Sequence, residues 1–489
     1  MKKNFYLIFA SIIILLTLTG CDQYKVDNDN VIENVHNPFP DYKYNQEKAQ
    51  SPYGQSLMAV SETGYYYIID NILYFYNINS DINMPLCSKS NCKHKDNSCD
   101  AYVNSINAEL ADFSCNCMEG KLFYYNNHLY CIEITADRDY YLYQYNTVFS
   151  DKKCMARLAS IKEEQRMVTN AGACLISNGY LYFFTSTMDE QYAQKGFIAD
   201  FQCNRIKLEE NAVIEQLGEF EFPGDYAMKA GESNGFAIYY SNENIYFYAG
   251  GTVRWHSKEN RVQYRVAKFD VQSNSFDMIW TYTGDEVHDV LGKDTGNVNV
   301  FSGGEYVRMD SYGNFYMLTA SENDVNINVS MIVKVNFENN TSSVIYKTLK
   351  EQIYSLQSDD EMLYFFEITS GRDTTSWLTA IHMDGTIQSS LELQYDEEYL
   401  SYMEDYYKNF PDANAVKPSA SHLIICGIDE RFILLKCPET CNVFKGLISS
   451  NIYKISGSMD KIAGVGVINK SEYLKNEETS IKQIYQCVL

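Results

Sequence analysis

Short runs of apolar and aromatic residues recur along this chain, and each run is broken by one tight turn. Seven segments consist of an apolar run, a turn of Asn, Asp, Ser or Gly, and a second run that often contains Leu-Tyr-Phe. Those turn residues tolerate positive φ, and the flanking residues favour a pleated strand. The pattern predicts seven β-hairpins, at residues 65–77, 122–133, 174–186, 237–249, 307–319, 354–366 and 423–435.

Further alternating segments extend most of these hairpins into units of three or four strands. Units of this kind, repeated along a chain, are typical of a β-propeller. We therefore predict an all-β fold, a single propeller of about seven blades over residues 56–489, with one short inserted helix at 396–409. Two β-sandwich domains are the alternative, but no Pro- or Gly-rich break divides the repeats. The predicted third strands are 142–147, 265–274, 331–340, 378–386 and 452–460.

The spacing of the repeats predicts insertions. Ile245, Phe315 and Leu363 occupy matched positions in consecutive hairpins, 70 and 48 residues apart. A blade usually needs about 40–50 residues, so several blades carry extra residues, which we expect in loops on one face. The last segment, 481–489, is expected to close the ring by pairing with residues 56–60.

The N-terminus carries a signal for export and lipidation. Lys2 and Lys3 precede the apolar run 5–18, which is too short to span a bilayer comfortably, and Leu-Thr-Gly-Cys follows, ending at Cys21. This order resembles the lipobox signal peptide of bacterial lipoproteins. The resemblance implies removal of residues 1–20, diacylation of Cys21, and anchoring to the cell membrane on its extracytoplasmic face. The alternative is an uncleaved N-terminal anchor with an incidental cysteine.

The composition of the chain after residue 20 is typical of a domain that lies outside the membrane. Residues 21–55 are polar and lack periodic apolar positions, which predicts a flexible tether behind the lipidated cysteine. The net charge of −24 disfavours nucleic acid and anionic headgroups, which carry the same sign, and favours cationic ligands or divalent ions. No later segment is long and apolar enough to predict a membrane span.

One loop concentrates residues that could bind a metal. Cys87, Cys92, His94 and Cys99 have the spacing C-x4-C-x-H-x4-C. Four such ligands could hold a tetrahedral Zn²⁺, although the spacing matches no zinc knuckle or ribbon. Outside the cytoplasm a disulfide staple is simpler, with a third cysteine joined to Cys115 or Cys117. A reduced loop is the third possibility, and we expect no cofactor unless zinc binds here.

The other cysteines divide into two groups. Cys437 and Cys441 lie on a turn and could form a disulfide. The second group lies within apolar strand segments and is expected to behave as small buried hydrophobic residues: Cys131, Cys174 and Cys426.

The cysteine loop also carries a resemblance. Pro-Leu-Cys at 85–87, Cys-Lys-His at 92–94 and Cys-Asp-Ala-Tyr at 99–102 follow the first predicted hairpin. This arrangement is similar to a motif in poorly characterised surface lipoproteins of Gram-positive anaerobes, placed after the first hairpin of a predicted propeller. The resemblance implies a surface-anchored propeller and supplies no catalytic residues.

Enzyme motifs do not occur in a suitable context. Residues 231–235 match G-x-S-x-G, but a predicted hairpin follows where a nucleophile elbow needs a helix. The seven histidines are scattered, and most of the 42 tyrosines suit strand packing. We therefore expect a monomeric ligand-binding or scaffold protein at the cell surface, whose ligand is a glycan or a peptide. The alternatives are a glycan-active hydrolase or lyase, and an accessory subunit of an envelope complex.

Overall fold

The structure is a computed structural model of the 489-residue chain. All described residues belong to one compact unit, Asn45–Leu489. They are residues 58–69, 71–104, 121–135, 139–146, 152–160, 163, 165–168, 172–187, 200–221, 235–254, 260–283, 297–300, 307–322, 328–337, 339, 341–348, 350, 352–359, 361–369, 375–393, 424–437, 462–476 and 481–488.

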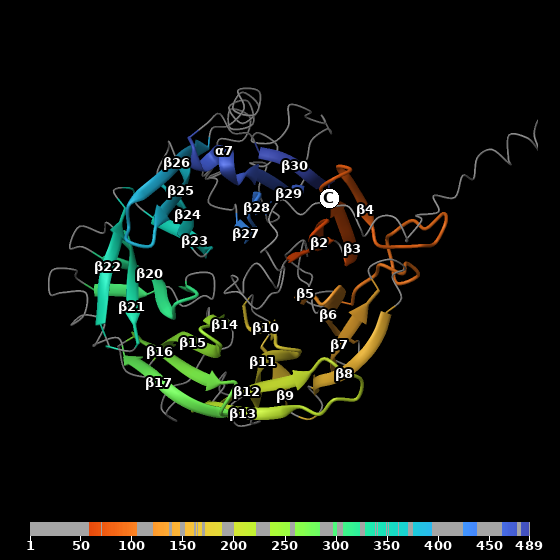
Figure 1. The fold of residues 1–489 in the computed structure, drawn as a ribbon, viewed down its shortest axis with the longest axis horizontal. Helices are drawn as coiled ribbons and strands as arrows, with labels where there is room; N and C mark the ends of the chain where they lie inside the picture. Colours follow the sequence, from red (N-terminus) through yellow and green to blue (C-terminus); the bar gives the residue numbers. More distant parts are fainter. Residues whose placement is uncertain are drawn as a thin grey trace, which may run out of the picture. The chain divides into compact units, whose positions relative to one another are not determined.

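Seven antiparallel sheets, formed by these residues, surround one axis as the blades of a propeller (Figure 1). Blades 1 to 3 comprise β1 (Met58–Val60), β2 (Gly64–Ile69), β3 (Ile72–Asn77) and β4 (Ile82–Pro85); β5 (Lys121–Tyr125), β6 (His128–Ile134), β7 (Asp139–Tyr145) and β8 (Lys152–Ser160); and β9 (Gln165–Met167), β10 (Cys174–Ser177), β11 (Tyr180–Thr187), β12 (Asp200–Lys207) and β13 (Glu215–Glu221).

The other four blades repeat this plan. Blades 4 and 5 comprise β14 (Gly235–Ser241), β15 (Asn244–Arg254), β16 (Asn260–Asp270) and β17 (Ser275–Thr283); and β18 (Asn297–Val300), β19 (Val307–Met309), β20 (Asn314–Glu322), β21 (Asn328–Asn336) and β22 (Thr341–Lys347). Blades 6 and 7 comprise β23 (Gln352–Ser358), β24 (Met362–Ile368), β25 (Ser376–His382) and β26 (Ile387–Leu393); and β27 (Ile424–Ile428), β28 (Phe432–Cys437), β29 (Ile462–Asn469), the helix α7 (Lys470–Leu474) and β30 (Ile481–Val488). The predicted all-β, seven-bladed fold is confirmed.

The predicted hairpins are present, but the one in blade 1 occupies a different place in its blade. In the six later blades the hairpin forms the first two strands of the meander, for example β5 and β6. In blade 1 the hairpin at 65–77 is β2 and β3, because the short strand β1 precedes it and pairs with β2. The strand β1 contacts β5, the first strand of blade 2, and is therefore the inner strand of blade 1.

Two predictions about blade 7 are wrong. The final segment β30 pairs with β29 as the outer strand of its own blade, and not with residues 56–60. The third strand is β29, which begins after the predicted segment 452–460; that segment lies outside the described residues. Each blade is therefore built from one continuous stretch of chain, and the ring closes through side-chain contacts between the first and last blades.

Tight turns within the hairpins place Asn in the left-handed region of backbone space. Asn126 and Asn127 have φ of 46° and 60°, Asn178 has 50°, and Asn242 has 48°. Asn adopts this conformation more readily than most residues because its short polar side chain bonds locally. The turn chemistry expected from the sequence is thus what forms these hairpins.

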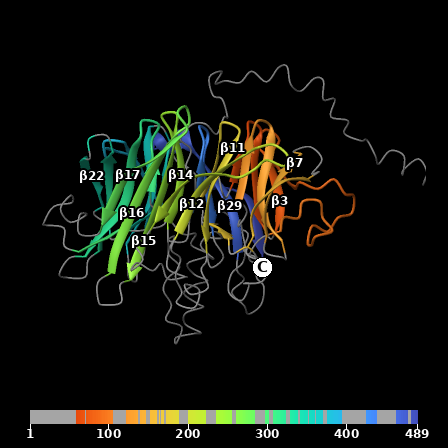
Figure 2. The same cartoon turned by 90° about the horizontal axis from the view of Figure 1, so that it is seen from below.

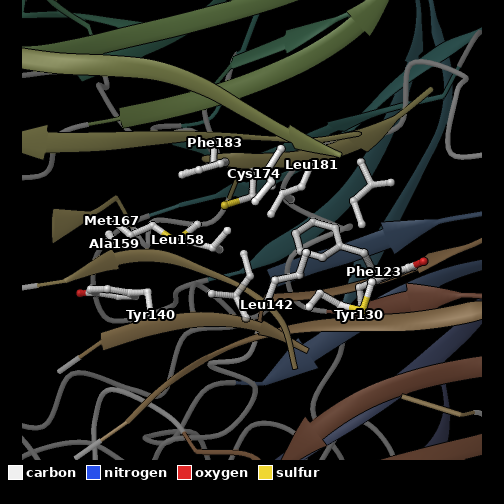
Figure 3. Packing of buried hydrophobic residues seen from close by; sticks show 14 of the residues in the cluster. Phe123, Tyr130, Tyr140, Leu142, Leu158, Ala159, Met167, Cys174, Leu181 and Phe183 are labelled. Carbon is white, nitrogen blue, oxygen red and sulfur yellow. The ribbon is translucent and has the colours of Figure 1, made fainter. Parts of the chain in front are cut away.

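The hydrophobic core lies between neighbouring blades. Figure 3 shows the interface of blades 2 and 3, where Phe123 and Leu142 of blade 2 face Cys174 and Phe183 of blade 3. The next interface is largely aromatic, and the ring centroids of Phe184 and Phe247 lie 5.4 Å apart, edge to face. Aromatic pairs in this arrangement contribute about 0.5–1.5 kcal/mol beyond burial. Tyrosine and phenylalanine therefore pack the blades together, as the sequence predicted.

The longest connections between described strands all leave from one face of the propeller. In an antiparallel meander, the second-to-third connection and the link to the next blade share one face, and the other turns share the opposite face. The links after β4 (to 121), β26 (393 to 424) and β28 (437 to 462) all belong to the first group. Figure 2 shows the strands crossing the ring from face to face. We call the face with the longest connections the loop face, and the other the turn face.

The helix α7 is a turn-face element that the sequence pattern did not reveal. Asn469 caps it by accepting a hydrogen bond from Glu472 N. Its buried Tyr473 donates to Leu378 O of blade 6 at 2.9 Å, so the helix fastens blade 7 to blade 6. The helix predicted at 396–409 lies outside the described residues. Among the helices of the described part, none is both long and apolar enough to cross a bilayer.

Candidate functional site

The cysteine loop begins where β4 ends and returns along the start of β3. Leu86 N donates to Leu73 O at 2.8 Å, which continues the β4 pairing by one residue. On the return, Leu73 N donates to Ala101 O at 2.9 Å, and Tyr102 bridges Ile72. Both ends of the loop are therefore held on the same strand, and residues 87–99 form a closed excursion.

The four predicted ligands converge at one point in this loop. The sulfur atoms of Cys87, Cys92 and Cys99 and a ring nitrogen of His94 all lie within 4.8 Å of one another. His94 Nδ1 is 3.3 Å from Cys99 Sγ. The backbone reaches this arrangement through positive φ at Asn91 (63°) and His94 (50°). The three cysteines carry free thiols in this structure, and a disulfide between two of them stays a prediction.

The surroundings shift the thiol pKa values of Cys87 and Cys99 in opposite directions. Burial raises the pKa of the Cys87 thiol, but hydrogen bonds from the backbone of Lys89 and Asp100, together with those from the thiols of Cys99 and Cys92, leave the pKa lowered. Burial raises the pKa of Cys99 to about 12. Lys89 Nζ lies beside the cluster, 2.6 Å from Asp100 Oδ1 and 2.7 Å from Ser98 O. Fixed N–H donors and a held cation favour negative charge on sulfur at the Cys87 side.

The loop is wedged between blades 1 and 2. Cys99, Ala101 and Val103 are buried in a cluster that also contains Leu73 of blade 1 and Leu129 of blade 2. The segment then reaches blade 2 directly, where Asn104 N donates to Glu133 Oε2 at 3.0 Å. The cysteine cluster is thus part of a joint between two blades.

Of the other cysteines, the structure describes the side chains of two that were predicted to be buried. Cys131 and Cys174 are fully buried in strands, as expected. Cys21 and Cys441, like Cys115 and Cys117, lie outside the described residues, as do the side chains of Cys437 and Cys426. The predicted lipidation and the predicted Cys437–Cys441 bond therefore stay predictions.

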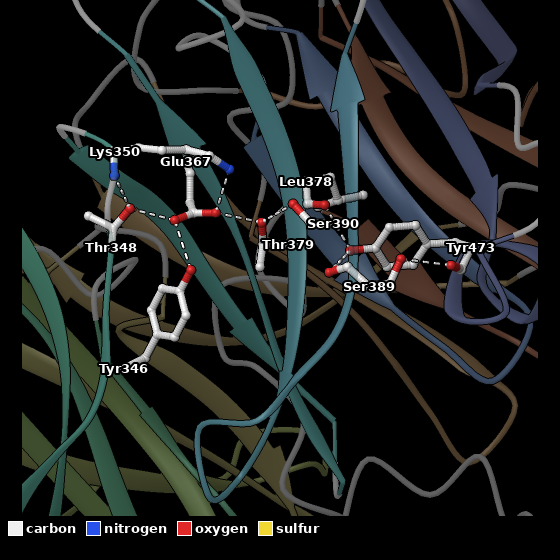
Figure 4. A network of polar contacts seen from close by, with 9 residues as sticks. All are labelled: Tyr346, Thr348, Lys350, Glu367, Leu378, Thr379, Ser389, Ser390 and Tyr473. Carbon is white, nitrogen blue, oxygen red and sulfur yellow. Dashed lines mark hydrogen bonds and ion pairs between the residues drawn. The ribbon is translucent and has the colours of Figure 1, made fainter.

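Two buried carboxylates form polar centres that sequence reasoning missed. Glu367 accepts from Thr348 Oγ1 (2.5 Å), Tyr346 OH (3.0 Å), Thr379 Oγ1 (2.8 Å) and Lys350 Nζ (2.9 Å), as Figure 4 shows. Burial raises its pKa, but the hydrogen bonds from Thr348, Lys350 and Thr379 and the charge of Lys350 outweigh burial, and the pKa of Glu367 is lowered.

Glu133 occupies the same place in blade 2. It follows Leu129 by four residues, as Glu367 follows Leu363, and both lie on the second strand of their blades. Glu133 accepts from Tyr145 OH at 2.5 Å and from Lys152 Nζ at 2.9 Å. The repeat alignment of L-Y-x-x-E would have revealed the pair. Because donors surround both carboxylates, their arrangement suits structural support better than acid–base chemistry.

Comparison with known proteins assigns this chain to no family. No family of known proteins matches the sequence, and no curated protein does. Among solved structures, a family PL25 ulvan lyase is similar at 9% identity over 90% of this chain and 96% of the lyase, with a TM-score of 0.41. A puromycin-hydrolysing peptidase of Mycobacterium tuberculosis has 9% identity over 68% of this chain and 43% of its own, with a TM-score of 0.37. TolB of Acinetobacter baumannii has 7% identity over 71% and 62%, with a TM-score of 0.30. At these TM-scores the likeness carries no argument about this chain, and the fold rests on its own strand pairing.

Proposed function

We propose that this protein is a lipid-anchored β-propeller on the extracytoplasmic face of the cell membrane, and that it binds a ligand on its loop face. The observation that carries the proposal is the placement of the longest connections, after β4, β26 and β28, at that one face. A rigid ring that presents long loops from several blades around one axis is a common design for a binding site.

The anchor follows from the N-terminal sequence. Lys2, the apolar run 5–18 and the box ending at Cys21 occur in the order of a lipoprotein signal. Two acyl chains on Cys21 hold a protein at a membrane far more firmly than one. The polar tether 21–55 would set the propeller at a distance of about 30 Å from the anchor.

The ligand is proposed to be a glycan or a peptide, bound without turnover. Both classes are met outside a cell, and tyrosine, abundant in this chain, contacts either through an apolar ring and a polar tip. The buried carboxylates Glu133 and Glu367 give no support to a hydrolase or lyase, since their oxygens already accept hydrogen bonds from the protein.

The anchor is tested by metabolic labelling. Cells expressing the wild-type chain or Cys21→Ala are fed an alkyne fatty acid, and the label on the purified protein is measured. The wild type should be labelled, Cys21→Ala should not, and external protease should digest the wild type on intact cells. A labelled Cys21→Ala protein, or a chain that protease cannot reach, would overturn the anchor.

The binding face is tested with a matched pair of loop replacements. The full chain is screened on glycan and peptide arrays made from cell-envelope components. Replacing 438–461 on the loop face with a Gly-Ser linker should abolish the binding that is found. Replacing the turn 271–274 on the turn face should leave it unchanged. If only the turn replacement abolishes binding, or the wild type turns over a glycan on the array, the proposal is wrong.

A further inference from the structure

The geometry of the cysteine loop resembles that of a tetrahedral metal site. In such a site Zn–S bonds of about 2.3 Å and a Zn–N bond of about 2.0–2.1 Å separate the ligand atoms by about 3.5–3.8 Å. Here the three sulfur atoms and the His94 nitrogen are all within 4.8 Å of one another, and the Nδ1 to Cys99 Sγ distance is 3.3 Å. The four ligand atoms therefore lie close to the positions that they would occupy around a single metal ion.

We propose that Cys87, Cys92, His94 and Cys99 bind one Zn²⁺ as a structural centre that fixes the joint between blades 1 and 2. Three thiolates and one imidazole are a donor set that zinc prefers over magnesium or calcium, which take oxygen ligands. The protein supplies all four ligands, so no coordination position is left for a substrate, and the centre is structural and not catalytic.

The charges around the loop fit this ion. Binding replaces three thiol protons with one Zn²⁺ and leaves the centre with a net charge of −1. Lys89 stands beside the centre, held at Asp100 and Ser98 O, and Lys93 and Lys95 flank His94 in the sequence. These cations offset the surplus negative charge in a chain that is otherwise strongly acidic.

A disulfide accounts for less of the arrangement. It would join two of the three sulfur atoms and leave the third, together with His94, without a role at the same point. Zinc uses all four groups. It also explains why the loop turns through positive φ at His94, because that turn brings the imidazole back toward Cys99.

The position of the zinc centre would let it stabilise the contact between blades 1 and 2. Cys99 is buried in the core shared by blades 1 and 2, while Cys87 lies two residues after the end of β4 of blade 1. An ion that joins Cys87 to Cys99 would hold residues 101–104 on β3 and thereby keep Asn104 on Glu133 of blade 2. Loss of zinc should therefore loosen this joint and lower the stability of the whole ring.

The test measures metal directly in the full chain. The chain is purified in detergent without chelator from cells grown with zinc, and metal content is determined by mass spectrometry. We expect about one zinc per chain. Cobalt exchanged into the site should give the strong visible bands of a tetrahedral ion and near-ultraviolet thiolate-to-metal absorption. Chelator should lower the melting temperature, and added Zn²⁺ should restore it.

Matched variants separate the site from other thiols and histidines. Cys92→Ser and His94→Ala should lose most of the zinc and the cobalt spectrum. The controls are Cys154→Ser, an exposed cysteine on β8, and His128→Ala, an exposed histidine on β6; both should keep wild-type zinc. If Cys92→Ser fails to fold, the chelation and zinc-return experiment on the wild type decides. Wild-type protein without zinc or the cobalt spectrum, or with a disulfide among Cys87, Cys92 and Cys99 found by mass mapping, would overturn the proposal.

Discussion

The hydroxyl of Tyr65 donates a 2.6 Å hydrogen bond to Asp429 Oδ2, although the two residues are 364 positions apart in the chain. Tyr65 lies on β2 of blade 1 and Asp429 in the hairpin turn of blade 7. The Asp429 carboxylate also accepts from Arg431 N and Phe432 N, both at 2.7 Å, and so caps its own turn. A single buried carboxylate thus shapes a local turn and joins the two ends of the propeller.

Blades 5 and 6 have the same turn, but there the tyrosine that donates to the turn aspartate comes from the same blade. Asp310 accepts from Tyr316 OH at 3.0 Å, and Asp359 accepts from Tyr364 OH at 2.8 Å, each within one blade. The corresponding position after Asp429 is Leu434, which has no hydroxyl. Tyr65 of blade 1 supplies the hydroxyl donor that blade 7 lacks, and its hydrogen bond to Asp429 is one of the contacts that close the propeller ring.

Removing this hydroxyl should weaken the whole domain. Tyr65→Phe keeps the aromatic side chain and its packing but removes the hydrogen bond to the buried carboxylate of Asp429. A hydrogen bond to a charged group contributes about 1.5–3 kcal/mol to the free energy of unfolding. Chemical denaturation followed by fluorescence should show a loss of that size. Tyr312→Phe is the control, because Tyr312 is 79% exposed in the equivalent turn of blade 5. Equal midpoints for both variants and the wild type would show that the bond contributes nothing.

Glu367 should be one of the most sensitive positions in the core. Glu367→Gln places an amide where Lys350 needs a carboxylate and where the hydroxyls of Thr348 and Thr379 need acceptors. Breaking a buried ion pair from one side costs about 3–5 kcal/mol. The free energy of unfolding should fall by that order, whereas Glu361→Gln, at an exposed position beside the same strand, should leave it within about 0.5 kcal/mol. A stable, wild-type-like Glu367→Gln protein would contradict a supporting role for this carboxylate.

The same carboxylate predicts a loss of stability in acid. The pKa of Glu367 is lower in the folded chain than its ordinary value, which is about 4.3 in an unfolded chain. Its contribution is therefore fully present above that value and is lost as the pH falls through the lower folded pKa. The free energy of unfolding, measured from pH 7 down to pH 3, should drop less steeply below about pH 4.3 for Glu367→Gln than for the wild type. Parallel curves would show that Glu367 titrates alike in both states.

Alanine substitutions at two glycines separate the cost of a left-handed backbone from the cost of a steric clash. Gly385 has φ of 93°, and a Cβ added there would lie 1.8 Å from Ile345 O of blade 5; Gly179 has φ of 77° with nothing within 4 Å. Gly179→Ala should cost about 1–2 kcal/mol for the left-handed backbone alone. Gly385→Ala carries the same strain and must also separate blades 5 and 6, so its melting temperature should be clearly the lower. If the two variants melt together, the close approach of the blades at Gly385 is not rigid.

Local sequence pattern determined the elements of this protein. Alternation of apolar and polar residues, with Asn or Asp at the breaks, predicted the hairpins because strand and turn formation depend on residues a few positions apart. The number of repeats then indicated the propeller, since each unit has two apolar faces that only neighbouring units can bury. The convergence of Cys87 and Cys99 also followed from their closeness in the chain, although their burial between two blades did not.

Only the tertiary structure decided which strand each segment becomes. The hairpin at 65–77 resembles the others in sequence, yet it lies one strand further from the axis, because β1 pairs with β2 first. The last segment, β30, has the same sequence pattern as the other strands. It pairs with β29 because β29 is the strand edge of blade 7 that lies next to it in the folded chain. The bond from Tyr65 to Asp429 and the donors around Glu367 come from different blades or strands. Such contacts depend on which distant residues the closed ring brings together, and a local sequence pattern does not predict those pairs.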